Sequence, residues 1–313
     1  MPTLLDLPNE LVLLICEQMS NGSLASFIRT CNVAQRIGKS VLYRLTPDAK
    51  LDVFIWALQN DRDPTMRYLV PDIVQSSTTD NEVGTSALLY ACSESRVLAV
   101  TGLLDGGVSP NLAMRGSSAL MEAVNGRDYK GSAECVRTLL SRGADVHAVD
   151  ERARTALHFA AEKGNTLTID LLLQAGADIH RANDRGKTPI LVAASKSQYH
   201  AVQRLLTNGA EVDDVDHVGR TALIYAAEQS VVSVARLVIQ HGADVDHADV
   251  LGRTAVSYAA ENGSLEMVRL LIEAGCNVTR RDVFGKRPVD YCSIMFSGVK
   301  VRDLLAAAEV RKA

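Results

Sequence analysis

The residues best suited to bind a metal ion lie in two acidic runs that also contain histidine, residues 213–217 and 241–247. Carboxylates and imidazoles are common metal ligands, but a calcium loop needs a Glu at its twelfth position. Counted from Asp213, that position holds Ile224. The sequence therefore predicts no metal and no cofactor at either run.

Glu122 is the candidate catalytic residue, because acid–base chemistry needs a titratable group in a partly dry, concave site. Tyr90 and Phe159 occupy positions equivalent to Glu122 in neighbouring copies of the repeat described next, and Tyr129 follows in a nearby loop. One hypothesis is a small-molecule pocket around Glu122. The alternative is a glutamate that is exposed in a groove or paired with Arg127 or Lys130.

A unit of 33 residues recurs along most of the chain. It is marked by threonines at equal intervals, namely Thr155, Thr188, Thr221 and Thr254. Each unit continues with an Ala-Ala pair, then a Leu-rich stretch, then Gly followed mostly by Ala and an acidic residue. A threonine can cap a helix, and a glycine suits the left-handed turn that ends one. Each unit is thus expected to form two helices that bury their apolar faces on neighbouring units.

Eight such helix pairs are expected, with the first and last degenerate. The interval from Ser118 to Thr155 is 37 residues. We assign the four extra residues to the stretch 125–131, between the paired helices of one unit.

The motif D-x-x-G-x-T-P-L-H-x-A-A, followed by L-L-x-x-G-A-D, resembles the ankyrin repeat over roughly residues 84–305. The resemblance implies an all-α ankyrin-repeat solenoid that binds proteins. It also implies a structural role for His158, which occupies the histidine position of the motif.

The resemblance further implies that partners contact the hairpin tips and the exposed ends of the first helices. The tips become apolar toward the C-terminus, and such a patch commonly marks an interaction surface. Beside them runs a column of cations, which would favour an acidic partner although Arg or Lys is ordinary at this position. The candidate target-binding residues are Arg152, Arg185, His217, Val218, Val250, Leu251, Val283 and Phe284 at the tips, with Arg220 and Arg253 from the cation column Arg154, Lys187, Arg220, Arg253 and Lys286.

The N-terminal 46 residues contain a different motif, L-P-x-E-L-x-x-x-I from Leu7 to Ile15, with a Leu–Phe segment after it. It resembles the F-box, whose helices dock on the Skp-type adaptor of a cullin-type ubiquitin ligase. The resemblance implies docking through Leu7, Pro8, Leu11, Ile15 and Leu24. The alternative is a helical bundle that only caps the array.

These patterns divide the chain into an F-box-like helical domain at residues 1–46, a degenerate first repeat with a polar connector at 47–83, and the ankyrin array with its C-terminal cap at 84–313. The formal net charge of −4 and the absence of a long basic run disfavour nucleic acid as a partner. Polar interruptions in the first apolar stretch argue against a signal peptide or a membrane span. Six scattered cysteines indicate reduced thiols and an intracellular, cytoplasmic or nuclear location.

The sequence therefore favours a protein-interaction adaptor. Specifically, it suggests the substrate receptor of a cullin-type ubiquitin ligase, in which the array holds an unknown target protein. One alternative is a plain ankyrin scaffold with a helical cap. The other is an ankyrin groove adapted as a small-molecule pocket, with catalysis at Glu122.

Overall fold

A computed structural model describes residues 51–55, 58, 70–71, 73, 81–114, 116–292 and 296–312. The expected F-box-like helices, with Leu7, Pro8, Leu11, Ile15 and Leu24, lie outside the described residues, as does most of the degenerate first repeat. The chain divides into two compact units, Met1–Asp150 and Glu151–Ala313.

The described part of the first unit contains two complete helix pairs and a short hairpin. In this hairpin the strands pair antiparallel, with Ala113 opposite Ser118. The first helices of the two pairs, α6 and α8, pack on each other, and so do the second helices, α7 and α9. The elements are α6 Asn81–Ser93, α7 Val97–Asp105, β1 Ala113–Met114, β2 Ser117–Ser118, α8 Ala119–Val124 and α9 Tyr129–Ser141.

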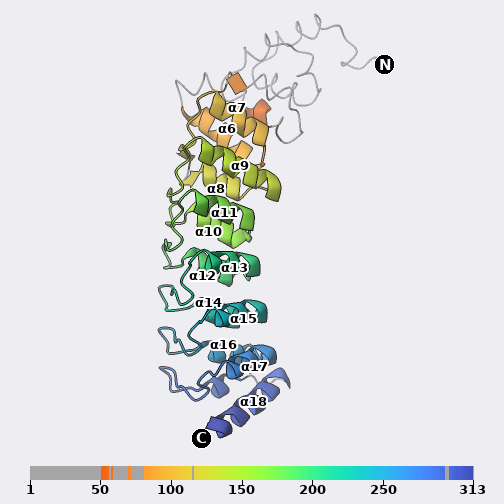
Figure 1. The fold of residues 1–313 in the computed structure, drawn as a ribbon, viewed down its shortest axis with the longest axis vertical. Helices are drawn as coiled ribbons and strands as arrows, with labels where there is room; N and C mark the ends of the chain where they lie inside the picture. The colour runs from red at the N-terminus through yellow and green to blue at the C-terminus, as the bar shows by residue number, and fades with distance from the viewer. Residues whose placement is uncertain are drawn as a thin grey trace, which may run out of the picture. The chain divides into compact units, whose positions relative to one another are not determined.

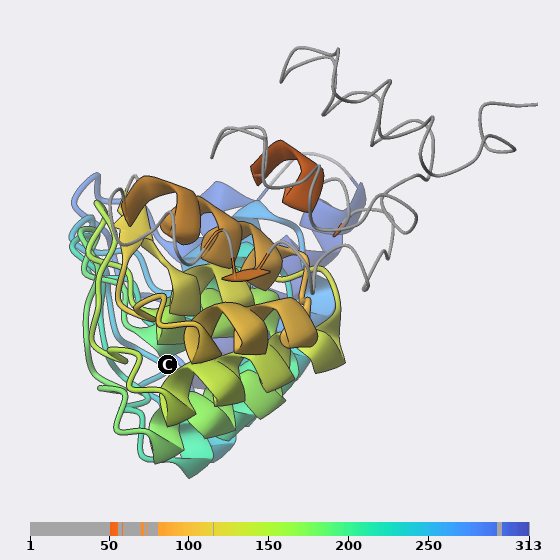
Figure 2. The ribbon, with the colours of Figure 1, turned by 90° about the horizontal axis from the view of Figure 1, so that it is seen from above.

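The second unit is a stack of helix pairs in two layers (Figure 1). The first helices form one layer and the second helices form the other, each packed on its neighbour in the next pair. Figure 2 looks along the stack and shows the connecting loops gathered along one side. The elements are α10 Ala156–Lys163, α11 Thr166–Gln174, α12 Pro189–Ser195, α13 Tyr199–Thr207, α14 Ala222–Glu228, α15 Val232–Gln240, α16 Ala255–Glu261, α17 Leu265–Glu273, η3 Pro288–Tyr291 and α18 Phe296–Lys312.

The expected helix boundaries are confirmed in this unit. Thr155, Thr188, Thr221 and Thr254 each precede a first helix with extended backbone. The Thr221 hydroxyl accepts a hydrogen bond from the amide of Ile224, whereas the side chains of Thr188 and Thr254 make no such cap. The glycines after the second helices have positive φ, from Gly143 at 82° in the first unit to Gly275 at 91°. The repeat therefore sets where helices start and stop, with side-chain capping at only some starts.

The four extra residues of the second described pair lie mainly in a helix, not in a loop as the sequence suggested. Helix α9 has 13 residues, whereas α7 and α11 have nine. The extra turn starts at Asp128, whose side chain accepts a hydrogen bond from the amide of Gly131 at 2.6 Å. An N-terminal cap of this kind stabilises the added turn.

The last pair is atypical, as the sequence predicted. Its first helix is the short 3₁₀ helix η3, and its second, α18, runs for 17 residues. Val301 and Leu305 on α18 are fully buried, and α18 packs on α17 and η3. The helix therefore covers apolar surface that a further repeat would otherwise cover.

The four cysteines within the described residues are free and buried. No described helix combines the length and apolar character needed to cross a membrane.

Candidate functional site

A buried carboxylate organises three of the loops that join the helix pairs of the second unit. In Asp216, Asp249 and Asp282 one carboxylate oxygen accepts hydrogen bonds from the backbone amides two and four residues later, at 2.9–3.0 Å. Asn183 makes the same contacts with its amide oxygen in the loop before them. These bonds satisfy the amides of the turn and fix its shape.

A tyrosine nine residues later donates a hydrogen bond to the second carboxylate oxygen of each aspartate. The Tyr225 hydroxyl donates to Asp216 at 2.5 Å and the Tyr258 hydroxyl donates to Asp249 at 2.6 Å. Tyr291 donates to Asp282 in the same way. We call these three contacts the Asp–Tyr pairs. In the preceding repeat the corresponding residues are Asn183 and Val192, so both the charge and the hydroxyl are absent together.

The Asp–Tyr contacts shift the pKa values of the three tyrosines and of Asp216 and Asp282. Burial, followed by the hydrogen bond to Asp282 and the charge of that carboxylate, raises the pKa of Tyr291 to about 12. Burial and the neighbouring Asp216 raise the pKa of Tyr225 in the same direction. Burial also favours a higher pKa for Asp216, but the hydrogen bonds from Tyr225 and two amides outweigh it, so the pKa of Asp216 lies below its ordinary value. The pairs therefore hold a neutral phenol against a charged carboxylate at neutral pH.

The turns present a row of exposed residues that we call the tip strip. Its members are Glu151–Arg152, Asp184–Arg185, His217–Val218, Val250–Leu251 and Val283–Phe284, and all ten side chains are exposed. The exposed fractions reach 62% for Val250, 63% for Val283 and 66% for Phe284. The expected apolar patch at the C-terminal tips is therefore present on the surface.

Backbone hydrogen bonds join each tip to the next. The amides of Asp184, His217, Val250 and Val283 donate to carbonyls of the preceding tip, each at 3.0 Å. The acceptors are the carbonyls of Arg152, Arg185, Val218 and Leu251. Because consecutive tips are bonded in register, the apolar side chains of the tip strip form one continuous surface.

Glycine permits this close approach. Gly219 and Gly252 have φ near +76°, and a Cβ on either would lie within 3.2 Å of the backbone of the following aspartate. Another residue at these positions would adopt an unfavourable backbone and would also press on the next tip.

The cation column stacks on aromatic rings. The Arg253 guanidinium lies 4.0 Å from the ring centre of Tyr258 and 4.4 Å from that of Tyr291. Tyr225 lies between Lys187 at 4.3 Å and Arg220 at 4.7 Å. Such contacts favour a cation over the ring face. The aromatic position singled out in the sequence therefore packs against the cation column.

Three of the five cations are neutralised by carboxylates of their own repeat. Arg154 lies 3.9 Å from Glu162, Arg220 lies 3.4 Å from Glu228, and Arg253 pairs with Glu261. In the repeat of Lys187, Ser195 stands where the other three repeats have the glutamate. Burial, and then the nearby Arg220, lowers the pKa of the Lys187 ammonium group. The column offers a partner much less free positive charge than its sequence suggests.

His158 has the structural role expected of it. Its side chain is buried, and Nδ1 accepts a hydrogen bond from the backbone amide of Thr155 at 3.1 Å. The proton therefore lies on Nε2, which donates to the carbonyl of Lys187 at 3.0 Å. The imidazole links one repeat to the next.

Glu122 is half-buried and is bonded by a residue that the sequence did not single out. It accepts a hydrogen bond from the Ser117 hydroxyl at 2.7 Å. Arg127, the suggested partner, instead pairs with Glu94 at 3.0 Å. Ser117 belongs to β2, so the short hairpin supplies the contact that the inserted loop was expected to supply.

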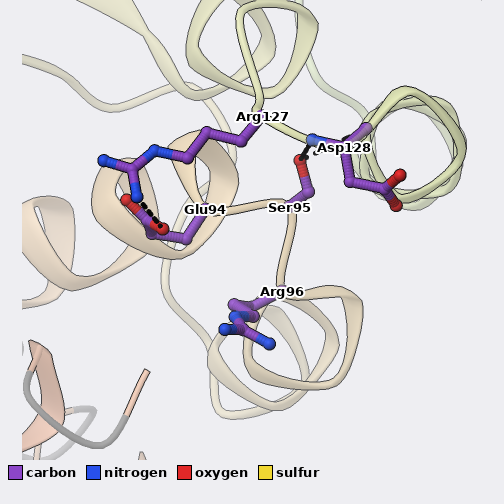
Figure 3. A pocket seen from close by; sticks show the side chains of 5 residues that line it. All are labelled: Glu94, Ser95, Arg96, Arg127 and Asp128. Atoms are coloured by element: carbon purple, nitrogen blue, oxygen red, sulfur yellow. Dashed lines mark hydrogen bonds and ion pairs between the residues drawn. The ribbon is translucent and has the colours of Figure 1, made fainter. Parts of the chain in front are cut away.

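A hollow of about 590 Å³ lies near the α8–α9 loop (Figure 3) and does not include Glu122. Ser95 accepts a hydrogen bond from the amide of Asp128 across it, and the Arg127–Glu94 ion pair closes one side. The lining residues are Glu94, Ser95, Arg96, Arg127 and Asp128. The lining is charged and polar, unlike the apolar wall typical of small-molecule pockets.

The two acidic runs serve the turns. Asp213 accepts from the amide of Asp244 at 3.0 Å, and Asp246 accepts from the amide of Asn277 at 2.6 Å. No group of three or more potential metal ligands occurs in the part of the chain that the structure describes.

Sequence reasoning missed the Asp–Tyr pairs and the ion pairs of the cation column, although both leave a signal. Asp and Tyr recur nine residues apart in three copies, and Arg and Glu recur eight residues apart in three copies. In both kinds of pair the first residue lies in the turn before the helix, so the contacts become apparent only once the turn folds back on the first helix.

Comparisons with known proteins agree with this architecture. The chain is similar to the crystal structure of the ankyrin repeat domain of Bcl-3, a member of the IkappaB protein family, at 28% identity and a TM-score of 0.60, over 70% of this chain and 97% of that one. It is similar to the human ASB11 ankyrin repeat domain at 28% identity and a TM-score of 0.61, over 70% of this chain and 96% of that one. A comparison with curated proteins gives no match.

The family described as "Ankyrin repeats (3 copies)" matches residues 54–150, 120–216 and 193–282, overlapping segments that extend over most of the chain. Ankyrin repeats indicate protein–protein interaction. On the periodicity, the stacked helix pairs and this match, the chain belongs to the ankyrin-repeat family.

Proposed function

We propose that this chain is an interaction adaptor whose tip strip holds a target protein. The observation that carries the proposal is the continuous apolar surface from Val218 to Phe284, kept in register by backbone bonds between tips. Burying such side chains contributes about 25 cal/mol per Å² of apolar area. Because the turns are held by buried aspartates, little conformational entropy is lost on binding.

The target-binding role is tested by charge substitution on the tip strip. The full chain and the Val250→Asp/Leu251→Asp variant would be used to capture partners from cell extract, with identification by mass spectrometry. A specific set of proteins captured by the wild type should be lost from the variant, because two carboxylates would be buried at the interface.

The matched control is Leu98→Asp/Leu167→Asp, which changes two other exposed apolar side chains, on α7 and α11. It should retain the captured set. If the control lost the captured proteins and the tip variant retained them, the tip strip would be rejected as the binding surface.

We further propose that residues 1–46 dock a Skp-type adaptor, which would make the chain a substrate receptor of a cullin-type ubiquitin ligase. The support is the L-P-x-E-L-x-x-x-I motif with its flanking helical pattern. Co-purification with a Skp adaptor should be abolished by Leu11→Asp/Ile15→Asp, since both apolar residues fall on the same predicted face. A complex that survives this double substitution would rule out docking through the motif.

A plain scaffold role, with the N-terminal residues acting as a cap, gives a different result. Residues 46–313 alone would then lose stability relative to the full chain, while the full chain would bind no Skp adaptor. Thermal unfolding of both proteins, alongside the co-purification, separates the two roles.

A further inference from the structure

We infer that the last tip of the array binds an acidic peptide segment that carries a large apolar side chain. The inference rests on the proposed function and names the partner chemistry at one end of the tip strip. The site consists of the apolar residues Val283 and Phe284 and three exposed cations, Arg280, Arg281 and Lys286.

No carboxylate pairs with Arg280, Arg281 or Lys286 among the described residues, unlike Arg220 and Arg253 of the two preceding repeats. Arg280 donates to the backbone carbonyl of Asp246 at 3.1 Å, and Arg281 donates to the carbonyl of Gly285 at 2.6 Å. Lys286 lies 5.1 Å from the ring centre of Tyr291. Neutral carbonyls and a ring position these groups without cancelling their charge.

The arginines of the preceding repeats provide a comparison within the same protein. Arg220 and Arg253 are held by Glu228 and Glu261 on their own first helices. In the last repeat the nearby carboxylates are already engaged, because Asp282 bonds to Tyr291 and Asp290 bonds to Arg287. The positive charge that carboxylates neutralise at Arg220 and Arg253 therefore remains free at the last tip.

The apolar half of the site is the most exposed pair of large apolar residues in the tip strip, at 63% for Val283 and 66% for Phe284. Phe284 and Val283 lie beside the three cations, and among the described residues the chain continues into η3 and α18 without another tip. A guanidinium has five N–H donors, so Arg280 and Arg281 each keep donors that can bind a carboxylate. A partner that places acidic groups beside a large apolar side chain would satisfy both halves.

The backbone at the last tip favours an extended partner. At the earlier tips the carbonyl equivalent to that of Phe284, such as the Leu251 carbonyl, accepts an amide from the next repeat. No such bond to the Phe284 carbonyl occurs within residues 281–292 or elsewhere in the described chain. An extended peptide can supply this amide, as in other additions to an open backbone edge.

The inference is tested with a phage-displayed library of random 16-residue peptides selected on the immobilised full chain. Peptides enriched by the wild type should carry net negative charge and at least one large apolar residue. Measured by fluorescence anisotropy, Arg280→Glu/Arg281→Glu should weaken binding of the synthesised peptides about tenfold or more. Raising the salt concentration should weaken wild-type binding as well.

Arg236→Glu/Arg269→Glu is the matched control, because it makes the same charge change at exposed arginines of α15 and α17. It should leave peptide binding within about twofold. Val283→Ser/Phe284→Ser should weaken binding without changing the net charge. Circular dichroism of each variant would verify the fold before binding is measured.

Three outcomes would overturn the inference: no enrichment of any peptide, enrichment of peptides that are not acidic, or equal weakening by both charge reversals. The adaptor function is judged separately. Capture of partners that is lost in Val250→Asp/Leu251→Asp but kept in Arg280→Glu/Arg281→Glu would preserve the proposed function and reject this site.

Discussion

At the scale of single residues, the Asp–Tyr pairs explain how flexible turns become a defined surface. One aspartate satisfies two amides of the turn with one oxygen and a tyrosine of the first helix with the other. The turn is thereby bonded to its own helix. The amides of Val218, Leu251 and Phe284 donate to these aspartates, so the apolar tip residues are held through their backbone while their side chains stay exposed.

Replacing Tyr225 by Phe should lower the free energy of unfolding by about 1.5–3 kcal/mol, because a buried carboxylate would lose a hydrogen bond. Urea unfolding monitored by circular dichroism measures the change. Tyr199→Phe serves as the control, since no hydrogen bond of the Tyr199 hydroxyl is found among the described residues, and it should change stability by less than about 0.5 kcal/mol. An equal effect of the two substitutions would show that the pair contributes nothing specific.

Stability should also depend on pH through Asp216. The pKa of Asp216 is lowered in the folded state, since its hydrogen bonds outweigh the opposing effect of burial. A lowered pKa stabilises the fold above the unfolded value of about 4, and this contribution is lost as the pH falls through the folded value. Asp216→Asn should therefore be less stable than the wild type at pH 7, and the difference should narrow below about pH 4.

Equilibrium unfolding at a series of pH values tests this expectation. Glu151→Gln, at an exposed tip, provides a comparison that should follow the wild type throughout. A stability difference for Asp216→Asn that stays constant from pH 7 to about pH 3 would contradict the assigned direction of the pKa shift.

Residue-level predictability was uneven. The exposed apolar tips could be predicted from the repeat period and from the apolar residues Val250, Leu251, Val283 and Phe284 at the tip positions. The ion pairs could not be predicted in this way. Whether Arg253 offers free positive charge to a partner depends on Glu261, which approaches Arg253 only in the folded turn. Free cations at Arg280 and Arg281 could be separated from neutralised ones only by their actual contacts.

At the scale of elements, the longer α9 shows how an insertion is accommodated. The repeat period places the four extra residues at 125–131, between the paired helices. A Cβ at Gly131 would lie 2.9 Å from the Ser95 carbonyl oxygen, so glycine serves close packing there and does not end the helix. The Asp128 cap then extends α9 backwards by one turn.

The terminal helix α18 offers a stability prediction. Leu305 is fully buried, whereas Val310 on the same helix is 78% exposed. Leu305→Ala should cost about 2–5 kcal/mol through lost burial and a cavity. Val310→Ala should change stability by less than about 0.5 kcal/mol, and thermal unfolding of both variants would compare them. Similar losses would show that α18 is not anchored through its buried face.

At the scale of the whole molecule, the array is stabilised mainly by contacts between neighbouring repeats. Within the second unit, Leu305→Ala should therefore speed amide hydrogen exchange most in α16 and α17 and least in α10 and α12. Hydrogen exchange with mass spectrometry resolves these segments. Uniform acceleration over the whole second unit would show that it opens as one cooperative block.

The family and the number of helices per repeat were predictable because a period of 33 residues leaves few alternatives. The division into two compact units at Asp150 was not, since the sequence motifs continue across it. The function of residues 1–46 rests on the motif from Leu7 to Ile15, because these residues lie outside the described part of the chain.

The Asp–Tyr pairs also constrain how the repeats can be exchanged. A repeat with Asn183 and Val192 closes its turn without either charge or hydroxyl, whereas the next three repeats use both. Moving the aspartate alone into the Asn183 repeat would leave one carboxylate oxygen without its phenol, and moving the tyrosine alone would leave a hydroxyl without its carboxylate. When repeats of this protein are exchanged by engineering, the aspartate and tyrosine positions should therefore be moved together. Substitutions at these two positions during evolution are likewise expected to occur together.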